Sequence, residues 1–334
     1  MVSPDAIAVL GAGSWGTALA ILLARNGFVT RLWGHLPEAV AALVNERENR
    51  VFLPGVFFPT TLQPTARLAE ALEGVREILV AVPSHAFRAT LAACAPHLDD
   101  SMDISWATKG FEPDTGKLLH EVASEVLGPR DWSVLSGPTF AREVALGLPT
   151  AITVAASTPQ HAQRVAGYLH SNRFRAYLSD DLIGVEVGGA TKNVLAIAAG
   201  IADGLMLGAN TRAALITRGL AEIMRLGAAL GGKRETFMGL AGLGDLALTC
   251  TDNQSRNRRF GLALASGQSA QEAQAMIGQE VEGIQTTQEV FRKAQRLGIE
   301  MPLCEQVYRV IVEGLSPQQS LQVLLERELR AEDQ

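Results

Sequence analysis

The chain has 334 residues, of which 47% are hydrophobic and 19% charged, and this length favours two domains over one. Its formal net charge is −6, so no overall basic field attracts nucleic acid, and a nucleic-acid partner is not expected. The three cysteines are far apart and odd in number. They provide neither a disulfide framework nor a metal spacing, and we expect inert thiols in a reducing compartment.

The amino-terminal half alternates short β-branched runs with helical patterns. In chain order, strands are expected at 6–10, 28–33, 77–82, 103–107, 133–136, 150–156 and 173–178, and helices at 14–26 and near 36–46. Segment 49–64 carries three prolines and is expected to form a long excursion at the rim. Strands separated by helices predict an α/β fold with a mostly parallel, doubly wound sheet of the Rossmann type.

Strand patterns stop near residue 189, and the remaining segments show helical spacing with Ser or Thr at their starts and Gly at their ends. The sequence therefore predicts a dinucleotide-binding domain over 1–189 and an all-helical substrate and catalytic domain over 190–334. No flexible linker separates them, which predicts a close interface with a cleft. The first residues enter a strand pattern at once, and the charge-free run between Glu143 and Arg164 contains prolines. We therefore expect no signal peptide, no membrane insertion and a cytoplasmic location.

The sequence VLGAGSWG places three glycines directly after the first strand and at the start of a helix. Gly11 permits a tight turn, Gly13 lets the backbone approach a pyrophosphate, and Gly16 allows the helix to pack closely on the strand. The backbone N–H groups near Ser14 and Trp15 then face the phosphates. This context predicts a dinucleotide site, although a turn used only for packing is the alternative.

The second strand has no acidic residue at its tip, where an Asp or Glu would bind the ribose 2′-hydroxyl of NAD. Gly34 and His35 stand there instead, so NADP is expected to be tolerated. Arg31, earlier in the same strand, is either a contact of the 2′-phosphate or a solvated side chain.

Two lysines stand out by their surroundings. Lys109 follows the strand 103–107, at the end of the sheet where ligands bind. Lys192 is the one charged residue between Glu186 and Asp203, in a run of small and apolar side chains. Burial would lower its pKa toward the value that a general base needs. The alternative is a lysine whose ammonium reaches water and has no function.

A second polar cluster lies between residues 237 and 260. Asp245 follows a glycine-rich run, so we expect it to be partly buried with a lysine as its partner, or to cap the next helix. A helix starting near Ser255, with arginines in its first turn, suits a phosphate dianion. Arg256 and Arg259 share one face of that helix while Arg258 does not, so at least one of the three is structural or exposed.

Taken together, these residues resemble the bacterial NAD(P)-dependent glycerol-3-phosphate dehydrogenases from about residue 6 to past 310. The motifs that carry the resemblance are GAGSWGTALA, VPSHAF, WATKG, SGPTFAREVALGLPTA, GGATKNVLAIAAGIADG, AGLGDLALTCTDNQSRNRRFG and EGIQTT. The resemblance implies reversible hydride transfer between NAD(P)H and dihydroxyacetone phosphate, a phosphorylated small molecule, to give sn-glycerol 3-phosphate for glycerophospholipid synthesis.

The resemblance also implies roles by position. Lys192 would be the proton acceptor, with Lys109 and Asp245 beside it in the catalytic site. The implied nucleotide contacts are Ser14, Trp15, His35, Lys109, Ala141, Arg256, Glu280 and Glu282, in addition to the glycine turn. The implied substrate contacts are Lys109, Gly137, Thr139, Lys192, Asp245, Ser255, Arg256 and Asn257. The family has a hydrophobic residue at position 280, so Glu280 departs from its pattern.

Two other functions fit parts of the sequence. A β-hydroxyacid dehydrogenase shares the architecture and a Lys-Asn pair, to which TKN corresponds loosely. A non-catalytic dinucleotide sensor would keep the fold, but would not need Lys109, Lys192 and Asp245 together. The six histidines show no ligand spacing with acids or thiols, so no metal is expected. Apolar surface on the helical half makes a homodimer plausible.

Overall fold

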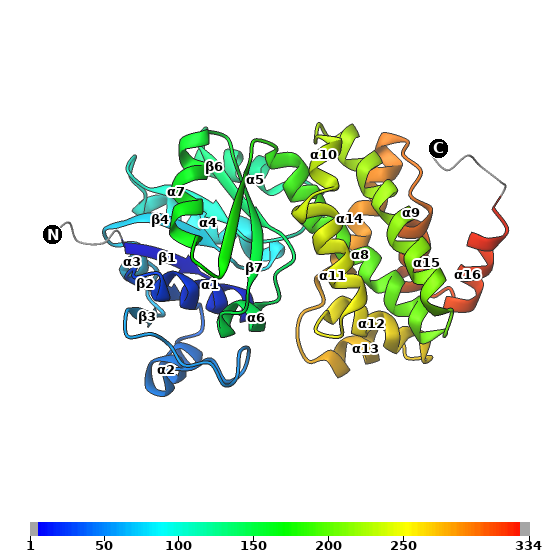
Figure 1. Cartoon of the computed structure of the whole chain (residues 1–334), viewed down its shortest axis with the longest axis horizontal. Coiled ribbons are helices and arrows are strands. Elements are labelled where there is room, and N and C mark those ends of the chain that lie inside the picture. Colours follow the sequence, from blue (N-terminus) through cyan, green and yellow to red (C-terminus); the bar gives the residue numbers. More distant parts are fainter. Residues whose placement is uncertain (1–5, 328–334) are drawn as a thin grey trace.

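The computed structural model describes residues 6–327, which form a sheet flanked by helices followed by a bundle of helices (Figure 1). The strands are β1 (Ala6–Leu10), β2 (Thr30–Trp33), β3 (Leu62–Thr65), β4 (Val75–Val80), β5 (Asp103–Trp106), β6 (Trp132–Ser136), β7 (Thr150–Ala156) and β8 (Phe174–Ser179). They form one eight-stranded sheet in the order β3-β2-β1-β4-β5-β6-β7-β8. All neighbouring strands are parallel except β6 and β7, which confirms the predicted fold class.

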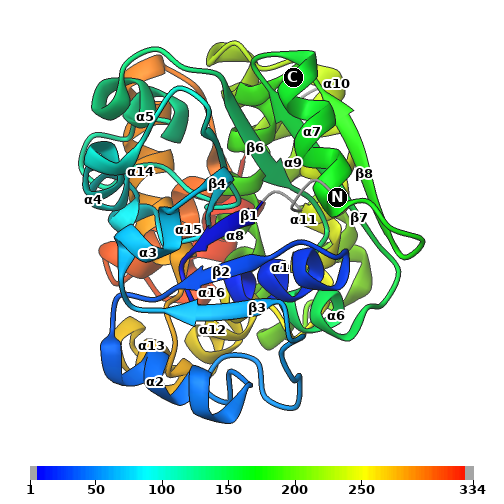
Figure 2. The ribbon, with the colours of Figure 1, turned by 90° about the vertical axis from the view of Figure 1, so that its left-hand side faces the viewer.

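Helices cover both faces of the sheet (Figure 2). They are α1 (Ser14–Arg25), α2 (Pro37–Glu46), α3 (Leu68–Leu72), α4 (Ser84–Cys94), the 3₁₀ turn η1 (Ala95–His97), α5 (Leu119–Leu127), α6 (Ala141–Leu146) and α7 (Pro159–Leu169). One buried cluster joins the sheet to α1, α6 and α7, and a second joins it to α3, α4 and α5. Strands β1 and β7 lie within the sheet and are almost wholly buried, and they are nearly continuous apolar runs.

The excursion expected over 49–64 is only partly right, because its end belongs to β3, the edge strand next to β2. The prolines obscured this strand in the sequence. An edge strand tolerates proline, since one side of its backbone makes no ladder hydrogen bonds. Pro64 pairs with Leu32 in the register, and the neighbouring Leu62 is fully buried.

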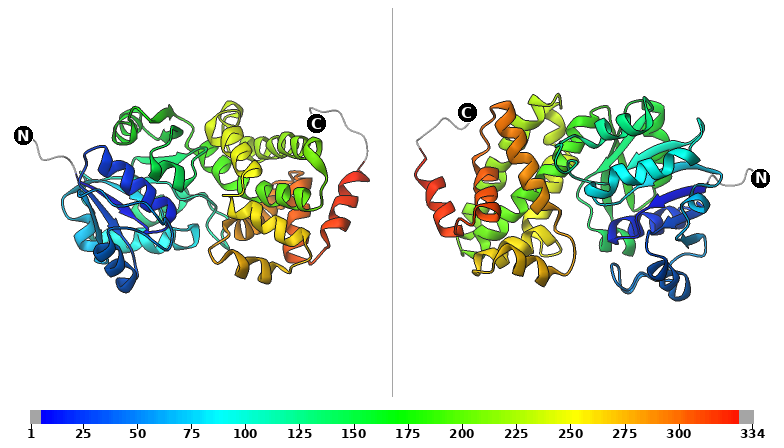
Figure 3. Two further views of the ribbon diagram at one scale, coloured as in Figure 1. Left: turned by 60° about the horizontal axis from the view of Figure 1, so that its bottom comes forward. Right: turned by 180° about the vertical axis from the view of Figure 1, so that it is seen from behind.

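From Leu182 to Leu325 every regular element of the described chain is helical, and these helices lie beside the sheet along the long axis (Figure 3). They are α8 (Leu182–Gly204), α9 (Gly208–Ala229), α10 (Arg234–Phe237), the π-helical turn η2 (Leu240–Gly244), α11 (Asp245–Thr251), α12 (Arg256–Ala265), α13 (Ala270–Ile277), α14 (Glu282–Leu297), α15 (Pro302–Val312) and α16 (Pro317–Leu325). The division at residue 189 stays a prediction, and α8 runs through that position.

Helix α8 is the centre of the helical region, where α9, α11, α12, α14 and α15 pack around it. Its glycines allow this, since a Cβ on Gly200 would meet the carbonyl oxygen of Arg258 in α12 at 2.1 Å. By length and composition α8 could also cross a membrane. However, 89% of its most apolar window is buried inside the protein, which is the pattern of a core helix.

Candidate functional site

The glycine turn has the geometry that its sequence predicts. Gly11 adopts a φ of +120°, and a Cβ on Gly16 would meet the carbonyl oxygen of Gly11 at 1.9 Å. No heavy atom lies within 4 Å of a Cβ built on Gly13, so the backbone there is open to a ligand. Helix α1 begins at Ser14, which directs its first N–H groups toward that space. The turn therefore fits the pyrophosphate of a dinucleotide.

A carboxylate lies between two lysines where the sheet meets the helical region. The Lys109 Nζ donates to Asp245 Oδ2 at 2.7 Å, and the Lys192 Nζ donates to Asp245 Oδ1. Lys192 Nζ also donates to the Thr249 hydroxyl at 3.0 Å. Lys109 comes from the loop after β5, Lys192 from α8 and Asp245 from the first turn of α11. The expectation that Asp245 is buried with a lysine partner is therefore confirmed.

The surroundings of Lys192 change its proton affinity. Lys192 is 8% exposed and Asp245 is 1% exposed. Desolvation by burial lowers the pKa of the Lys192 ammonium from 10.5 to about 8, since it outweighs the attraction of the Asp245 carboxylate. The nearby Lys109 charge lowers the pKa further. Lys192 can therefore exist as an amine or an ammonium near neutral pH, as proton transfer in both directions requires.

Two glycines explain how α8 brings Lys192 to this place. A Cβ on Gly188 would meet the carbonyl oxygen of Ala241 in η2 at 2.6 Å, and one on Gly189 would meet the Ser136 Oγ at 2.6 Å. Lys192 follows these glycines by four and three positions, so it shares their helix face. Because Gly188 and Gly189 have no Cβ atoms, this face of α8 can lie close to η2 and to the end of β6. The Lys192 side chain extends from the same face into the space between these elements.

The start of α12 has the features expected of a phosphate site. The Ser255 hydroxyl caps the helix and accepts from the Arg258 backbone N–H at 3.1 Å. The Arg258 side chain is buried and pairs with Asp203 at 2.6 Å, so it is structural, which agrees with the expectation that at least one of the three arginines is structural or exposed. Within residues 6–327 the Arg256 guanidinium makes no hydrogen bond or ion pair, which leaves it available to an anion.

A hydrogen-bonded chain joins α12 to α8 and α14. The Asn257 amide donates to Asn193 Oδ1 at 2.9 Å and accepts from the Gly283 backbone N–H at 2.9 Å. Asn193 in turn donates to Glu282 Oε2 at 3.3 Å. Asn193 was not expected in the site from the sequence, although its place directly after Lys192 was a signal. Thr249 was not expected there either, although its spacing of four residues from Asp245 puts it on the same helix face.

The other implied positions lie after the carboxyl ends of parallel strands or at the start of α14. Trp15 is in the first turn of α1, exposed His35 follows β2, and Ala141 is the first residue of α6. Gly137 and Thr139 follow β6, with the Thr139 hydroxyl donating to the Gly137 carbonyl oxygen at 3.2 Å. These loops meet at the carboxyl ends of the parallel strands, where ligands bind in doubly wound folds.

Glu280 has an unexpected partner. It lies just before α14, and its Oε1 is 3.1 Å from the Nδ1 of His85 in the first turn of α4. Burial raises the pKa of the Glu280 carboxyl, and the neighbouring Glu282 charge raises it further.

Arg31 also has partners, since its guanidinium donates to the backbone carbonyl oxygens of Glu70 and Glu73, which favours a structural role.

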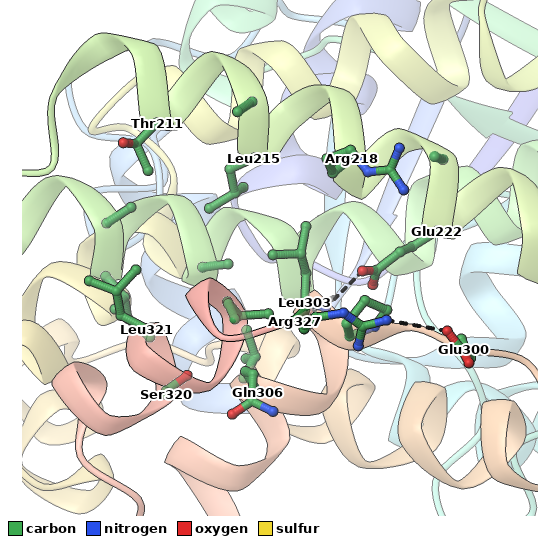
Figure 4. Close-up of a pocket in the computed structure, with 18 of the residues that line it drawn as sticks. Thr211, Leu215, Arg218, Glu222, Glu300, Leu303, Gln306, Ser320, Leu321 and Arg327 are labelled. Atoms are coloured by element: carbon green, nitrogen blue, oxygen red, sulfur yellow. Dashed lines mark hydrogen bonds and ion pairs between the residues drawn. The ribbon is translucent and has the colours of Figure 1, made fainter. Parts of the chain in front are cut away.

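A large cavity of about 1220 Å³ lies elsewhere, between α8, α9, α15 and α16 (Figure 4). None of the residues that line it belongs to the Lys109–Asp245–Lys192 cluster.

In the described residues one group of possible metal ligands also lies apart from that cluster: Glu77, Asp103 and His161. These three are far apart in the sequence, which explains why spacing did not reveal them.

Comparison with known proteins identifies the same family over most of the chain. Residues 6–162 match the amino-terminal part, and residues 181–322 the carboxyl-terminal part, of NAD-dependent glycerol-3-phosphate dehydrogenase. The glycerol-3-phosphate dehydrogenase (NAD(P)+) of Methylococcus capsulatus is 57% identical over 328 residues, covering 98% of each chain. That of Shewanella halifaxensis is 56% identical over 98% of this chain and 97% of its own.

Solved structures agree with the sequence comparison. The crystal structure of glycerol-3-phosphate dehydrogenase from Coxiella burnetii has a TM-score of 0.95 and 52% sequence identity. It covers 97% of this chain and 99% of its own. A D-mandelate dehydrogenase with NADH and anilino(oxo)acetate has a TM-score of 0.62 at 12% identity, which shows that it shares the fold.

Proposed function

The chain belongs to the NAD-dependent glycerol-3-phosphate dehydrogenase family, and from this premise we propose which of its residues carry the reaction. The enzyme transfers hydride between NAD(P)H and dihydroxyacetone phosphate, giving sn-glycerol 3-phosphate, and the reaction is reversible. Lys192 is the proton donor and acceptor, Asp245 and Lys109 hold it in place, and the start of α12 binds the substrate phosphate.

The proton step follows from the two forms of Lys192. A bound NAD(P)H would supply the hydride that reduces the substrate carbonyl. As negative charge develops on the carbonyl oxygen, the Lys192 ammonium donates a proton and becomes an amine. In the reverse direction the amine accepts the hydroxyl proton. A pKa of about 8 allows both forms near neutral pH.

Asp245 and Lys109 position this group. Because Asp245 binds one lysine on each carboxylate oxygen, it fixes the distance between them and balances one of the two charges. Thr249 accepts a further hydrogen bond from Lys192 and donates to the Asp245 backbone carbonyl oxygen at 2.6 Å. Lys109, which is the less buried lysine, would polarise the substrate and contact the nucleotide.

The phosphate would bind at the first turn of α12. Its N–H groups, the Ser255 hydroxyl and the Arg256 guanidinium favour a dianion at a helix start. The binding energy of the phosphate, which does not react, would hold the reacting carbon in line with Lys192. Arg256 would reach both ligands, and Asn257 would add a donor from its amide. The remaining proposed contacts of the substrate are Gly137 and Thr139.

The nucleotide would bind at the carboxyl end of β1. Its pyrophosphate would lie on the turn formed by Gly11, Gly13 and Gly16. The other proposed contacts are Ser14, Trp15, His35, Lys109, Ala141, Arg256, Glu280 and Glu282. The open space at Gly13 and the free N–H groups of α1 support this placement.

The buried Lys192–Asp245–Lys109 arrangement carries the proposal, and a spectrophotometric assay tests it. We expect dihydroxyacetone phosphate to drive oxidation of NADH or NADPH. A Lys192→Met variant, which keeps the apolar stem, should bind cofactor but lose this activity. A β-hydroxyacid dehydrogenase would instead prefer an unphosphorylated oxoacid, and a dinucleotide sensor would bind cofactor without turnover. Either result would contradict the proposed function.

We further propose that the product enters glycerophospholipid synthesis and that the enzyme works in the cytoplasm. Glycerol 3-phosphate supplies the backbone of these lipids, and the three cysteines are free and buried, which suits a reducing compartment. A conditional knockout should require external glycerol 3-phosphate for membrane growth. Fractionation with an antibody should recover the protein with cytosolic markers.

We also propose that the protein is a homodimer, with the cavity between α9 and α16 facing the second copy. Leu215, Leu303 and Leu321 line this cavity, together with Arg218 and the buried Glu222 (Figure 4). A second copy of the chain could cover these apolar side chains. Sedimentation velocity should give a dimer that Leu321→Asp weakens and Leu297→Asp, on α14, does not. A wild-type monomer at all concentrations would contradict the proposal.

A further inference from the structure

A polar cluster that the reaction does not use lies under α7. Glu77 on β4 pairs in register with Asp103 on β5, and Ser105 on β5 pairs with Ser133 on β6. Paired residues share a sheet face, and so do residues two apart on a strand, so all four side chains point to one side. His161 from α7 lies over them, with its Nε2 3.4 Å from the Ser105 Oγ.

The cluster is deeply buried and incompletely hydrogen-bonded. His161, Glu77, Ser105 and Ser133 are each at most 2% exposed. The Glu77 Oε2, the Ser133 Oγ and the His161 Nδ1 have no hydrogen-bond partner. A buried carboxylate oxygen without a donor is costly, because water no longer solvates it. The apolar core around α7 therefore contains a polar centre whose hydrogen bonds do not account for all of its atoms.

The three potential metal ligands converge. One ligand atom each from Glu77, Asp103 and His161 lie within 4.8 Å of one another. The Nε2 of His161 is 3.7 Å from the Glu77 Oε2, the oxygen that lacks a donor. Ligands about 2.0–2.2 Å from a zinc ion lie closer together than this, so binding would draw the three atoms inward slightly.

Neighbouring side chains already orient the two carboxylates. The Ser105 hydroxyl donates to Glu77 Oε1, which leaves Oε2 directed toward His161. Arg164 donates to Asp103 Oδ2 at 2.9 Å, which leaves Oδ1 for another ligand. In metal sites, ligating carboxylates are held by outer hydrogen bonds of this kind.

We propose that Glu77, Asp103 and His161 form a binding site for a first-row divalent cation such as Zn²⁺. One imidazole and two carboxylates are a ligand set that zinc accepts, and a water could complete it. The cation would tie β4 and β5 to α7. Asp103 begins β5, whereas the catalytic Lys109 follows its other end, so this site is structural and separate from the reaction.

The competing explanation is a proton shared between His161 and Glu77, which would satisfy the same oxygen without a metal. Isothermal titration of Zn²⁺ into the untagged, full-length, chelator-treated protein distinguishes the two. We expect one saturable site per chain and a rise in the melting temperature with zinc. Glu77→Gln and His161→Gln should weaken binding at least about tenfold. The control variants Glu38→Gln and His97→Gln, both on the surface, should bind as the wild type does.

Variants of a buried cluster can fail to fold, so the wild type provides a second test. Crystals grown with Zn²⁺ should show an anomalous peak at the zinc absorption edge between the Glu77, Asp103 and His161 side chains. Anomalous peaks only at other places, or no saturable binding in solution, would overturn the proposal. Unchanged binding in folded Glu77→Gln and His161→Gln proteins would also overturn it.

Discussion

The Asp245→Asn substitution tests the central electrostatic argument, because it removes one charge with almost no change in shape. Asp245 is buried and accepts from Lys109 at 2.7 Å and from Lys192. Its carboxylate raises the pKa of Lys192, while burial and the Lys109 charge lower it. In the variant only the two lowering effects remain. The pKa of Lys192 should therefore fall below its value of about 8.

The size of the change follows from Coulomb's law. Two unit charges about 4 Å apart interact by about 4 kcal/mol at an effective dielectric constant of 20, which corresponds to about 3 pKa units. The asparagine oxygen still accepts a hydrogen bond from Lys192, and water partly rehydrates the site. We therefore expect about half of that limit, a fall of about 1 to 2 pKa units.

The assay is kcat/KM against pH in both directions, since this profile reports groups of the free enzyme. In the wild type, alcohol oxidation should rise and carbonyl reduction should fall as pH passes through about 8. In Asp245→Asn both inflections should move down together. Asp180→Asn, a surface carboxylate paired with Lys233, should leave them in place. Lower activity with an unmoved inflection would refute the reasoning, because loss of structure alone changes the rate but not the pKa.

The remaining predictions concern the other site residues. Lys192→Ala should lower turnover by about a hundred- to ten-thousand-fold, with NADH affinity by fluorescence titration unchanged, and near-normal turnover would contradict its role. Arg256→Ala should lower kcat/KM about ten- to a hundredfold for dihydroxyacetone phosphate but hardly at all for dihydroxyacetone, and equal losses would show that the arginine does not bind phosphate. Glu280→Val should tighten NADPH binding up to about fivefold, because it removes a carboxylate from the proposed contacts of an anionic nucleotide, and weaker binding would indicate that Glu280 is a favourable contact.

The sequence predicted the layers of the fold well, because the strands buried on both faces are apolar runs and the helices are periodic. It predicted β1 and β7 without error and placed β2, β4, β5, β6 and β8 within about two residues. It missed β3, since Pro64 disguised an edge strand that is recognisable only from its pairing with β2. The antiparallel β7 could not be foreseen either, because direction depends on how the chain returns and not on the strand's composition.

The site was predictable where a residue conflicts with its surroundings. A lysine among glycines and alanines, and an aspartate after a glycine run, both require a partner, and each is the other's partner. Residues whose local context is ordinary were missed, as Thr249 and Asn193 show. The buried cluster at His161 was missed for a different reason. Its members come from β4, β5 and α7, and only the sheet register brings them to one face.

Under the proposed role of Lys192, the charge balance of the Lys109–Asp245–Lys192 cluster explains why it has two lysines and one carboxylate. With both lysines protonated the cluster carries one positive charge, and it becomes neutral when Lys192 gives up its proton. It therefore never presents negative charge to an oxygen that is itself becoming negative. A second carboxylate would hold Lys192 in its charged form and remove it as a base. Without Asp245, the two ammonium groups would repel each other and lower the pKa of Lys192. Less of the Lys192 ammonium would then be present to donate a proton to the substrate.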